Sequence, residues 1–460
     1  MRLAEALRDN AYGMGKSHLL RWSRLRPHAQ NQDMALSKEL EMDNRPAQLT
    51  GGILKPTPEL DGIRGWACAS VLIAHCLTGV IKVEPGSLAA SFNSHTLWLF
   101  LGGVDLFFVL SGFLIGGILI DSKARAGTSL NLRDYAASFW IRRIARIFPV
   151  AYLLLATYCA ALFVRNKFGI TQLDNWLLAE PRPPVASFAT FTQSWWIAVG
   201  GYGGPRWMGI TWSLAIEEQF YLLFPFAIYF LRRRWVVALV IAGIVAAPIL
   251  RDILERLFGS WYAPYVLLPS RVDGLMFGVA VALIIRDPRT FYLARLLRRV
   301  LDVVALFILY LIVTNYLPSW WRGPSGSLYP LKQSLLALMW AIVILRIFTY
   351  EHSVFNAIWR NSILAKIGLI SYGLYMYHQA INGLIHEFIF NQEPTIANAA
   401  QFAAALGVLA AAFGAAILSY VYFESPIRRF GQKLAATSKG KLIQDSPLAI
   451  SDSVAQTPSR

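Results

Sequence analysis

The sequence predicts an all-α integral membrane protein with about ten transmembrane helices in one bundle. Hydrophobic residues make up 56% of the 460 residues and charged residues only 15%, whereas a soluble domain averages about 25% charged residues. About twenty consecutive apolar residues span a bilayer as an α-helix, and the chain has about ten such stretches. They are residues 62–81, 97–120, 146–165, 211–231, 234–251, 265–285, 301–317, 331–349, 367–389 and 401–423. Of these, 234–251 and 301–317 are the shortest and carry the weakest signal.

Polar segments flank this apolar region. Residues 1–55 are predicted to be a basic, disordered cytoplasmic tail, residues 56–432 a transmembrane domain, and residues 433–460 a second disordered cytoplasmic tail. Residues 1–50 contain no apolar core of the kind found in a cleavable signal peptide, so we expect the first span itself to act as the signal.

The placement of positive charge predicts the orientation. With the N-terminus in the cytoplasm, 33 of the 43 Lys and Arg residues fall on the cytoplasmic side of the ten predicted spans. Cytoplasmic loops of membrane proteins carry such an excess. The net charge of +16 is therefore attributed to membrane topology rather than to nucleic-acid binding, and both termini are expected in the cytoplasm.

Arg64 and His75 interrupt the first apolar stretch. Eleven residues are about three helical turns, so both side chains are expected on nearly the same helix face, about 16 Å apart along the axis. This spacing would place a cation near one membrane surface and an imidazole about halfway across. Ionisable groups at such depth are costly and usually functional, and histidine is suited to proton transfer near neutral pH.

Polar motifs interrupt other predicted spans in the same way. In chain order the motifs are Leu60 to Gly65, Gly103 to Phe113, Arg142 to Pro149, Thr211 to Tyr221, Arg271 to Gly274, Ser371 to His378 and Glu424 to Arg428. Together they resemble the membrane acyltransferase-3 family, which O-acylates surface polysaccharides, lipopolysaccharides and related molecules. The chain departs from the family pattern at Ala215-Ile216, where Ser-Val is usual, at Tyr377, where Trp is common, and at Ala380, where Pro is common.

The resemblance implies that His75 and Arg64 are catalytic, because they match the family's motif of an arginine, ten residues and a histidine. A neutral imidazole can take the proton of an acceptor hydroxyl as it attacks a thioester. Direct transfer and a transient acyl-histidine both stay open. Arg64 would stabilise the thiolate leaving group or a phosphate of coenzyme A. The alternatives are a packing histidine and an arginine that extends to the lipid headgroups.

Arg143 and Arg146 lie at i and i+3 and are expected to share one face at the cytoplasmic start of the third span. Guanidinium groups match phosphate oxygens, and in the family this Arg-x-x-Arg serves the cytoplasmic donor. We therefore expect the pair to bind the phosphates of coenzyme A, assisted by Arg142. The alternative is ordinary positive charge on the cytoplasmic side.

The remaining polar positions are assigned to acceptor binding or to structure, and are Asp105, Ser111, Glu217, Glu218, Arg271 and His378. Adjacent carboxylates face about 100° apart on a helix, so one glutamate is expected to pair with a base such as Arg271 and the other to bind acceptor hydroxyls. Asp105 is expected to orient His75, to bind sugar, or to form a structural ion pair. His378 is expected to make a packing hydrogen bond, with acceptor binding as the alternative. The histidines show no metal-ligand spacing, so no metal is predicted.

These expectations combine into a membrane O-acyltransferase of a bacterial inner membrane. Residues 56–432 would form the acyltransferase domain. The donor would be cytoplasmic acyl-CoA, most simply acetyl-CoA, and the acceptor a hydroxyl of a saccharide or lipid-linked glycan at the outer face. No bound cofactor is expected. Some family members add a periplasmic hydrolase-like domain that this chain lacks, so it is expected to act unaided or with a separate periplasmic or export partner.

Two other classes of protein compete with this interpretation. A polytopic transporter also uses intramembrane His, Asp and Glu side chains as a proton relay. A non-catalytic assembly factor for polysaccharide export would tolerate loss of His75. The sequence specifies neither the acceptor nor the acyl chain, and it gives no oligomeric state.

Overall fold

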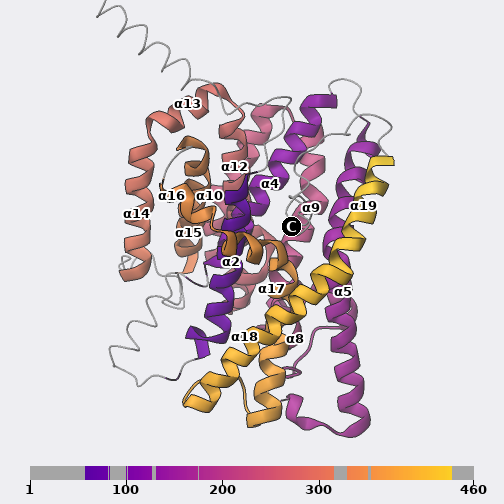
Figure 1. Cartoon of the computed structure of the whole chain (residues 1–460). Helices are drawn as coiled ribbons and strands as arrows, with labels where there is room; N and C mark the ends of the chain where they lie inside the picture. Colours follow the sequence, from indigo (N-terminus) through magenta and orange to yellow (C-terminus); the bar gives the residue numbers. More distant parts are fainter. Residues whose placement is uncertain are drawn as a thin grey trace, which may run out of the picture. The chain divides into compact units, whose positions relative to one another are not determined.

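The helices of the computed structural model follow the apolar stretches of the sequence (Figure 1). The structure describes residues 57–80, 82, 100, 102–126, 131–174, 176–314, 329–350 and 354–437, all within one compact unit, Gly51–Arg460. The predicted tail 1–55 and residues 438–460 of the second predicted tail lie outside the described residues. The long helices are α2 (Pro58–Cys76), α4 (Gly103–Ala126), α5 (Leu132–Phe168), α9 (Thr211–Phe230), α10 (Arg233–Phe258), α12 (Leu268–Ile285), α14 (Arg298–Thr314), α15 (Tyr329–Thr349), α17 (Ser362–Phe390) and α18 (Ala399–Ser419).

Each of the ten predicted segments contains one of these helices, but the count of about ten spans is not confirmed. Among the described residues, seven helices are long and apolar enough to cross a membrane. The other three segments contain α9, α14 and α17. Helix α14 has only 17 residues, whereas α9 and α17 are long enough and carry more polar side chains. The all-α class is confirmed, since the described residues form no strand.

Helices α2 and α17 pack with their backbones in contact. A Cβ atom at Gly65 would collide with the backbone of α17, and one at Gly368 would collide with the backbone of Asp61. Farther along both helices, His75 is hydrogen bonded to His378. The two helices therefore run in the same direction, as the prediction requires for its first and ninth spans.

Helices α4 and α12 form a second parallel pair. Ion pairs join them near both ends, Arg271 with Asp105 and Arg286 with Asp121. Between these pairs, a Cβ atom at Gly278 would collide with the backbone of α4. Small residues allow such close helix contact within a membrane, where packing rather than hydrophobic burial holds helices together.

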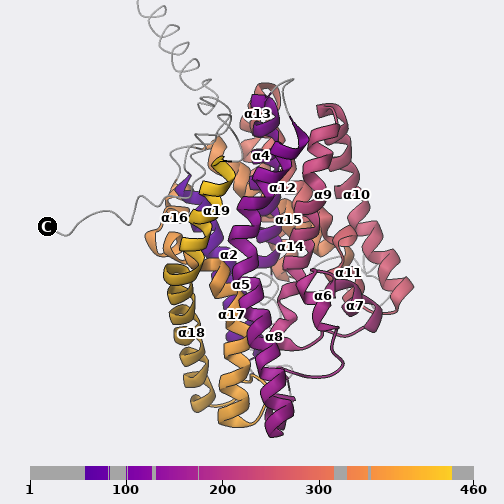
Figure 2. The same cartoon turned by 90° about the vertical axis from the view of Figure 1, so that its right-hand side faces the viewer.

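Helix α5 is longer than predicted and runs the length of the unit in Figure 2. Its 37 residues correspond to about 55 Å, well beyond the roughly 30 Å of a bilayer core. The helix begins at Leu132, where the side chain of Asn131 accepts a hydrogen bond from the backbone of Arg133. Arg143 and Arg146 therefore lie three to four turns inside the helix, and their position at the cytoplasmic start of the membrane span stays a prediction.

Shorter helices complete the described unit. They are η3 (Thr78–Val80), η5 (Thr171–Asp174), α6 (Val185–Ala189), α7 (Gln193–Gly200), α8 (Arg206–Gly209), α11 (Tyr262–Val266), α13 (Pro288–Leu296), α16 (Val354–Trp359), a π-helical turn at Tyr420–Glu424, and α19 (Ser425–Thr437). Helix α19 packs against α5 and includes the first five residues of the predicted second tail.

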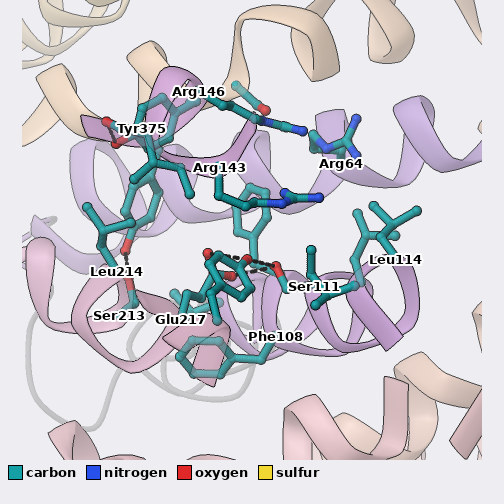
Figure 3. Close-up of a pocket in the computed structure, with 18 of the residues that line it drawn as sticks. Arg64, Phe108, Ser111, Leu114, Arg143, Arg146, Ser213, Leu214, Glu217 and Tyr375 are labelled. Atoms are coloured by element: carbon teal, nitrogen blue, oxygen red, sulfur yellow. Dashed lines mark hydrogen bonds between the residues drawn. The ribbon is translucent and has the colours of Figure 1, made fainter. Parts of the chain in front are cut away.

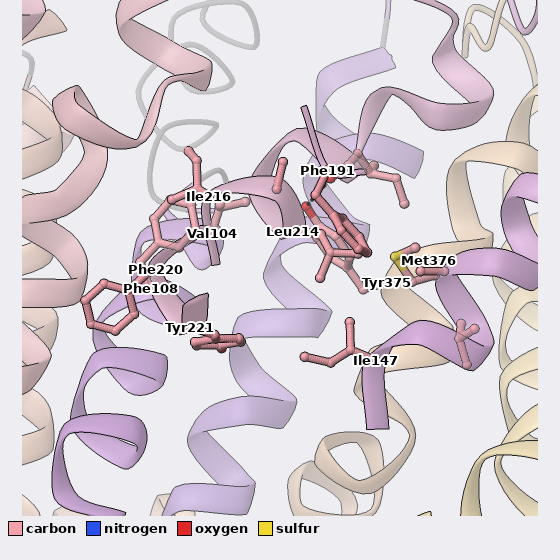
Figure 4. Packing of buried hydrophobic residues seen from close by; sticks show 14 of the residues in the cluster. Val104, Phe108, Ile147, Phe191, Leu214, Ile216, Phe220, Tyr221, Tyr375 and Met376 are labelled. Carbon is pink, nitrogen blue, oxygen red and sulfur yellow. Dashed lines mark hydrogen bonds between the residues drawn. The ribbon is translucent and has the colours of Figure 1, made fainter. Parts of the chain in front are cut away.

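The main hydrophobic core joins α4, α5, α9 and α17 (Figure 4). Its buried members include Phe108, Ile147, Phe220, Tyr221 and Tyr375. Aromatic rings contribute large buried areas and fixed orientations. Because Tyr221 and Tyr375 also carry hydroxyl groups, this core presents polar atoms to the space beside it.

Candidate active site

Five long helices, α2, α4, α5, α9 and α17, line a cavity of about 100 Å³ (Figure 3). Apolar side chains cover much of its wall, including Phe107, Leu110 and Leu114. The polar side chains that line it are Arg64, Ser111, Arg143, Arg146, Ser213, Glu217, Tyr221, Ser371, Tyr372 and Tyr375. The cavity thus brings together Arg64, Ser111, Glu217 and the arginine pair, which the sequence singled out from four separate helices.

Three guanidinium groups dominate one side of the cavity. In Figure 3 the side chains of Arg143 and Arg146 extend toward Arg64. Arg64 is buried and forms an ion pair with Asp61 at 2.5 Å. The guanidinium of Arg143 lies over the ring of Tyr221, 5.5 Å from its centroid. Neither Arg143 nor Arg146 forms an ion pair with any described residue. The carboxylates of Glu217 and Glu218 act on Arg143 only from a longer distance, and both guanidinium groups line the cavity.

A carboxylate and two hydroxyl groups occupy the opposite side. The Ser111 hydroxyl donates to Oε1 of Glu217 at 2.6 Å, and the Tyr221 hydroxyl lies 3.1 Å from Oε2. Tyr221 Oη is also 3.1 Å from Ser111 Oγ. This triangle fixes the carboxylate without using an arginine. The spacing of Glu217 and Tyr221, i and i+4 on one helix face, was the signal in the sequence that could have identified Tyr221.

The predicted pairing of a glutamate with Arg271 is wrong. Arg271 forms its ion pair with Asp105 at 2.9 Å, and its guanidinium lies against the rings of Phe108 and Trp212. Asp105 is thus part of a structural ion pair between α4 and α12, and the expectation that it orients His75 fails. The Oε1 atom of Glu218 is buried without a hydrogen-bond partner in the described chain.

His75 does not line the cavity, and it lies at the end of its helix. Helix α2 begins at Pro58 and ends at Cys76, so His75 occupies the last turn rather than the middle of the span. Its Nδ1 atom is 2.9 Å from Nε2 of His378. The carbonyl oxygen of His75 accepts a hydrogen bond from Asn382 at 3.3 Å.

Tyr375 lies between the cavity and the histidine pair. Its side chain lines the cavity, and its hydroxyl is 2.8 Å from Ser213 Oγ. Its ring centroid is 5.8 Å from that of His378. The sequence motifs predict no role for Tyr375, although it precedes His378 by three residues and so shares its helix face.

A smaller cavity of about 20 Å³ adjoins the first. It shares Arg64, Arg146, Ser371 and Tyr372 with the larger cavity and adds Tyr420, Glu424 and Arg428. Glu424 ends the π-helical turn that follows α18. Single π-turns within helices often occur at functional sites. Arg142 lines neither cavity, so the structure gives no support to its predicted assisting role.

A match to a family model shows to which protein family the chain belongs. The model described as "Acyltransferase domain" matches residues 57–424. The chain belongs to this acyltransferase family. The match covers every long helix up to the π-helical turn, and it confirms the resemblance drawn from the sequence motifs.

Several relatives of this family are similar to the chain over about four fifths of its length. YrhL from Bacillus subtilis, named as a candidate peptidoglycan O-acetyltransferase, is 30% identical over 396 residues, which cover 81% of this chain and 55% of that protein. The peptidoglycan O-acetyltransferase OatA of Listeria monocytogenes is 29% identical over 400 residues, 82% of this chain and 56% of OatA. The chain thus spans about half the length of the curated relatives it matches. No solved structure matches the chain.

Proposed function

We propose that this chain is a multi-pass membrane O-acetyltransferase that uses acetyl-CoA as donor and the hydroxyl of a cell-envelope glycan as acceptor. The observation that carries the proposal is the pair of guanidinium groups, Arg143 and Arg146, that line a cavity within the helix bundle and form no ion pair with any described residue. Such charges favour an anionic ligand, and guanidinium groups suit phosphate. Family membership and the names of the relatives support the acyl-transfer chemistry.

The arginine cluster would hold the donor. The phosphate groups of acetyl-CoA would bind Arg143 and Arg146, with Arg64 nearby. Eleven residues of α2 separate Arg64 from His75, about 16 Å along the helix axis. A long, flexible pantetheine arm can extend over such a distance, past Tyr375, while the charged end of the donor stays at the arginines.

His75 would then act as the general base. The acceptor oxygen attacks the thioester carbonyl carbon while Nε2 of His75 takes the hydroxyl proton. The carbon–sulfur bond breaks, the electron pair leaves with sulfur, and the imidazolium returns its proton to the thiolate. The products are the O-acetyl ester and free coenzyme A, and His75 is neutral again. No metal takes part in these steps.

The proposed direction of transfer is from the cytoplasmic to the outer face of a bacterial inner membrane, with both chain termini in the cytoplasm. The excess of Lys and Arg on one side of the predicted spans supports this orientation. The names of the relatives favour peptidoglycan as the acceptor. A separate export or periplasmic partner stays a prediction.

The test compares membranes that contain the intact protein, His75→Ala or His386→Ala at matched expression. Labelled acetyl-CoA is supplied, and label is followed into lipid-linked and envelope glycans. We expect transfer with the intact protein and with His386→Ala, and a loss of roughly 100-fold or more with His75→Ala, the usual contribution of a general base. Full transfer by His75→Ala would place the base elsewhere. No transfer by the intact protein would contradict the proposed function and favour the transporter.

A further inference from the structure

The imidazole rings of His75 and His378 meet edge to edge. Their centroids are 5.2 Å apart and their planes differ by 12°, while Nδ1 of His75 is only 2.9 Å from Nε2 of His378. A face-to-face stack at that centroid distance could not bring two ring nitrogens so close. The rings therefore lie nearly in one plane and share an in-plane hydrogen bond with good geometry.

The backbone fixes which nitrogen of His378 carries its proton. Nδ1 of His378 is 2.6 Å from the carbonyl oxygen of Tyr375. A carbonyl oxygen can only accept, so Nδ1 is the protonated nitrogen. His378 is fully buried, and in the described chain no carboxylate is bonded to either ring. A neutral His378 therefore presents an acceptor lone pair on Nε2.

This acceptor determines the tautomer of His75. The nitrogen of His75 that faces it is Nδ1, so Nδ1 must donate and carry the proton. Gln379 places its Nε2 atom 3.2 Å from the same Nδ1, and its Oε1 has no partner in the described residues. A half-turn of the amide makes Oε1 a second acceptor for the same N–H.

The opposite nitrogen of His75 is then a base. The ring is partly exposed, and Nε2 makes no hydrogen bond with any described residue. The available lone pair is therefore on Nε2, at the accessible edge of the ring.

We propose that His378 is a positioning residue that holds His75 as the Nδ1–H tautomer, with the Nε2 lone pair directed to the acceptor hydroxyl. This inference rests on the proposed function. During transfer the hydroxyl proton moves to Nε2 of His75, and the resulting imidazolium keeps its Nδ1–H bond to His378. A hydrogen bond from an ionised donor is stronger than one from a neutral donor, so His378 also stabilises the charge that develops.

Three variants of α17 separate positioning from simple packing. His378→Leu removes the acceptor, His378→Gln places an amide oxygen where Nε2 was, and His386→Leu is the matched control. His386 lies on the same helix, is also fully buried, and bonds a backbone carbonyl through Nδ1 at 3.0 Å, but its Nε2 has no partner in the described chain.

We expect His378→Leu to lower kcat by roughly 100-fold, in the range seen when a partner that orients a catalytic imidazole is lost. KM for acetyl-CoA should change by less than about threefold, because the donor arginines are untouched. His378→Gln should restore kcat to within about tenfold of the intact enzyme, and His386→Leu should keep it. Equal losses in His378→Leu and His378→Gln, with melting temperatures unchanged, would overturn the positioning role.

A second measurement determines the tautomer of His75 without an activity assay. The protein is labelled with ¹⁵N in its imidazole rings, and the His75 signals are assigned by their loss in His75→Gln. We expect a protonated Nδ1 and an unprotonated Nε2 in the intact protein, and a loss of this preference in His378→Leu. A protonated Nε2 in the intact protein would contradict the inference. Absence of acetyl transfer by the intact protein would contradict the proposed function, while the spectrum would still decide the tautomer.

Discussion

The α4–α12 pair and the arginine side of the cavity both place guanidinium groups inside the bundle, and they differ in what those groups meet. Between α4 and α12, Arg271 pairs with Asp105 at 2.9 Å and Arg286 pairs with Asp121 at 2.7 Å. Beside the cavity, Arg143 and Arg146 form no ion pair with a described residue. The α4–α12 arginines are paired with carboxylates across a helix interface, whereas Arg143 and Arg146 line the cavity.

This difference in pairing distinguishes arginines that stabilise the bundle from arginines that are available to a ligand. A paired charge on one helix satisfies its partner on the next, and removing either partner is costly. A buried charge without an ion-pair partner gains no such stability and is a candidate for binding a ligand. By this criterion the α4–α12 arginines hold the bundle together, and the cavity arginines are the groups that we propose to bind the ligand.

The largest expected effect is on the paired region. Asp105→Asn removes the carboxylate that pairs with Arg271, which is only 2% exposed, and should lower the free energy of unfolding by about 3–5 kcal/mol. Thermal unfolding in mild detergent measures the effect. Replacing Arg271 as well, by Gln, should recover part of the loss because no buried charge is then left behind.

The control for this prediction is an exposed ion pair on α10, Arg256 with Asp252 at 2.8 Å. Asp252→Asn should leave the melting temperature nearly unchanged, since solvent screens such pairs. If Asp105→Asn and Asp252→Asn unfold at the same temperature, the α4–α12 pair is not the structural element described here.

The second prediction concerns the close contact that brings these charges together. Gly278→Ala adds a Cβ atom that collides with the backbone of α4, and the shift needed to accommodate it should cost about 1–3 kcal/mol of unfolding free energy. Gly407→Ala on α18 is the matched control, because no atom lies within 4 Å of its Cβ position. The melting temperature should fall for Gly278→Ala and stay level or rise for Gly407→Ala; equal changes would contradict close packing.

The sequence predicted the helices because bilayer thickness sets the length of an apolar span. It placed the start of α5 fourteen residues late, since the charged side chains of Arg133, Asp134, Arg142 and Arg143 interrupt the apolar pattern while the helix continues. At the first span the shift is in the opposite direction: residues 62–81 are predicted, which puts His75 near mid-span, whereas α2 begins at Pro58 and ends one residue after His75. Apolar runs indicate which residues lie in lipid, and the ends of a helix need not coincide with the ends of its apolar run.

The sequence predicted which residues belong to the site better than it predicted which of them are in contact. Family motifs identified Arg64, Arg143 and Glu217, and the structure brings them to one cavity. Which carboxylate pairs with Arg271 depends on the rotation of each helix about its axis, and spacing along one helix does not determine that rotation. The hydrogen bond between His75 and His378 joins residues 303 positions apart, a contact that only the packing of α2 on α17 creates.

The most direct test of the central claim is the equilibrium binding of acetyl-CoA to the purified protein by calorimetry. Replacing both Arg143 and Arg146 by Gln should weaken binding by roughly 10- to 100-fold, because two charge-assisted phosphate contacts are lost, while the melting temperature without ligand should not fall. Arg133→Gln, at an exposed position on the same helix, should bind acetyl-CoA normally. If the double variant binds acetyl-CoA as tightly as the intact protein, Arg143 and Arg146 do not form the donor site, and the central claim is wrong.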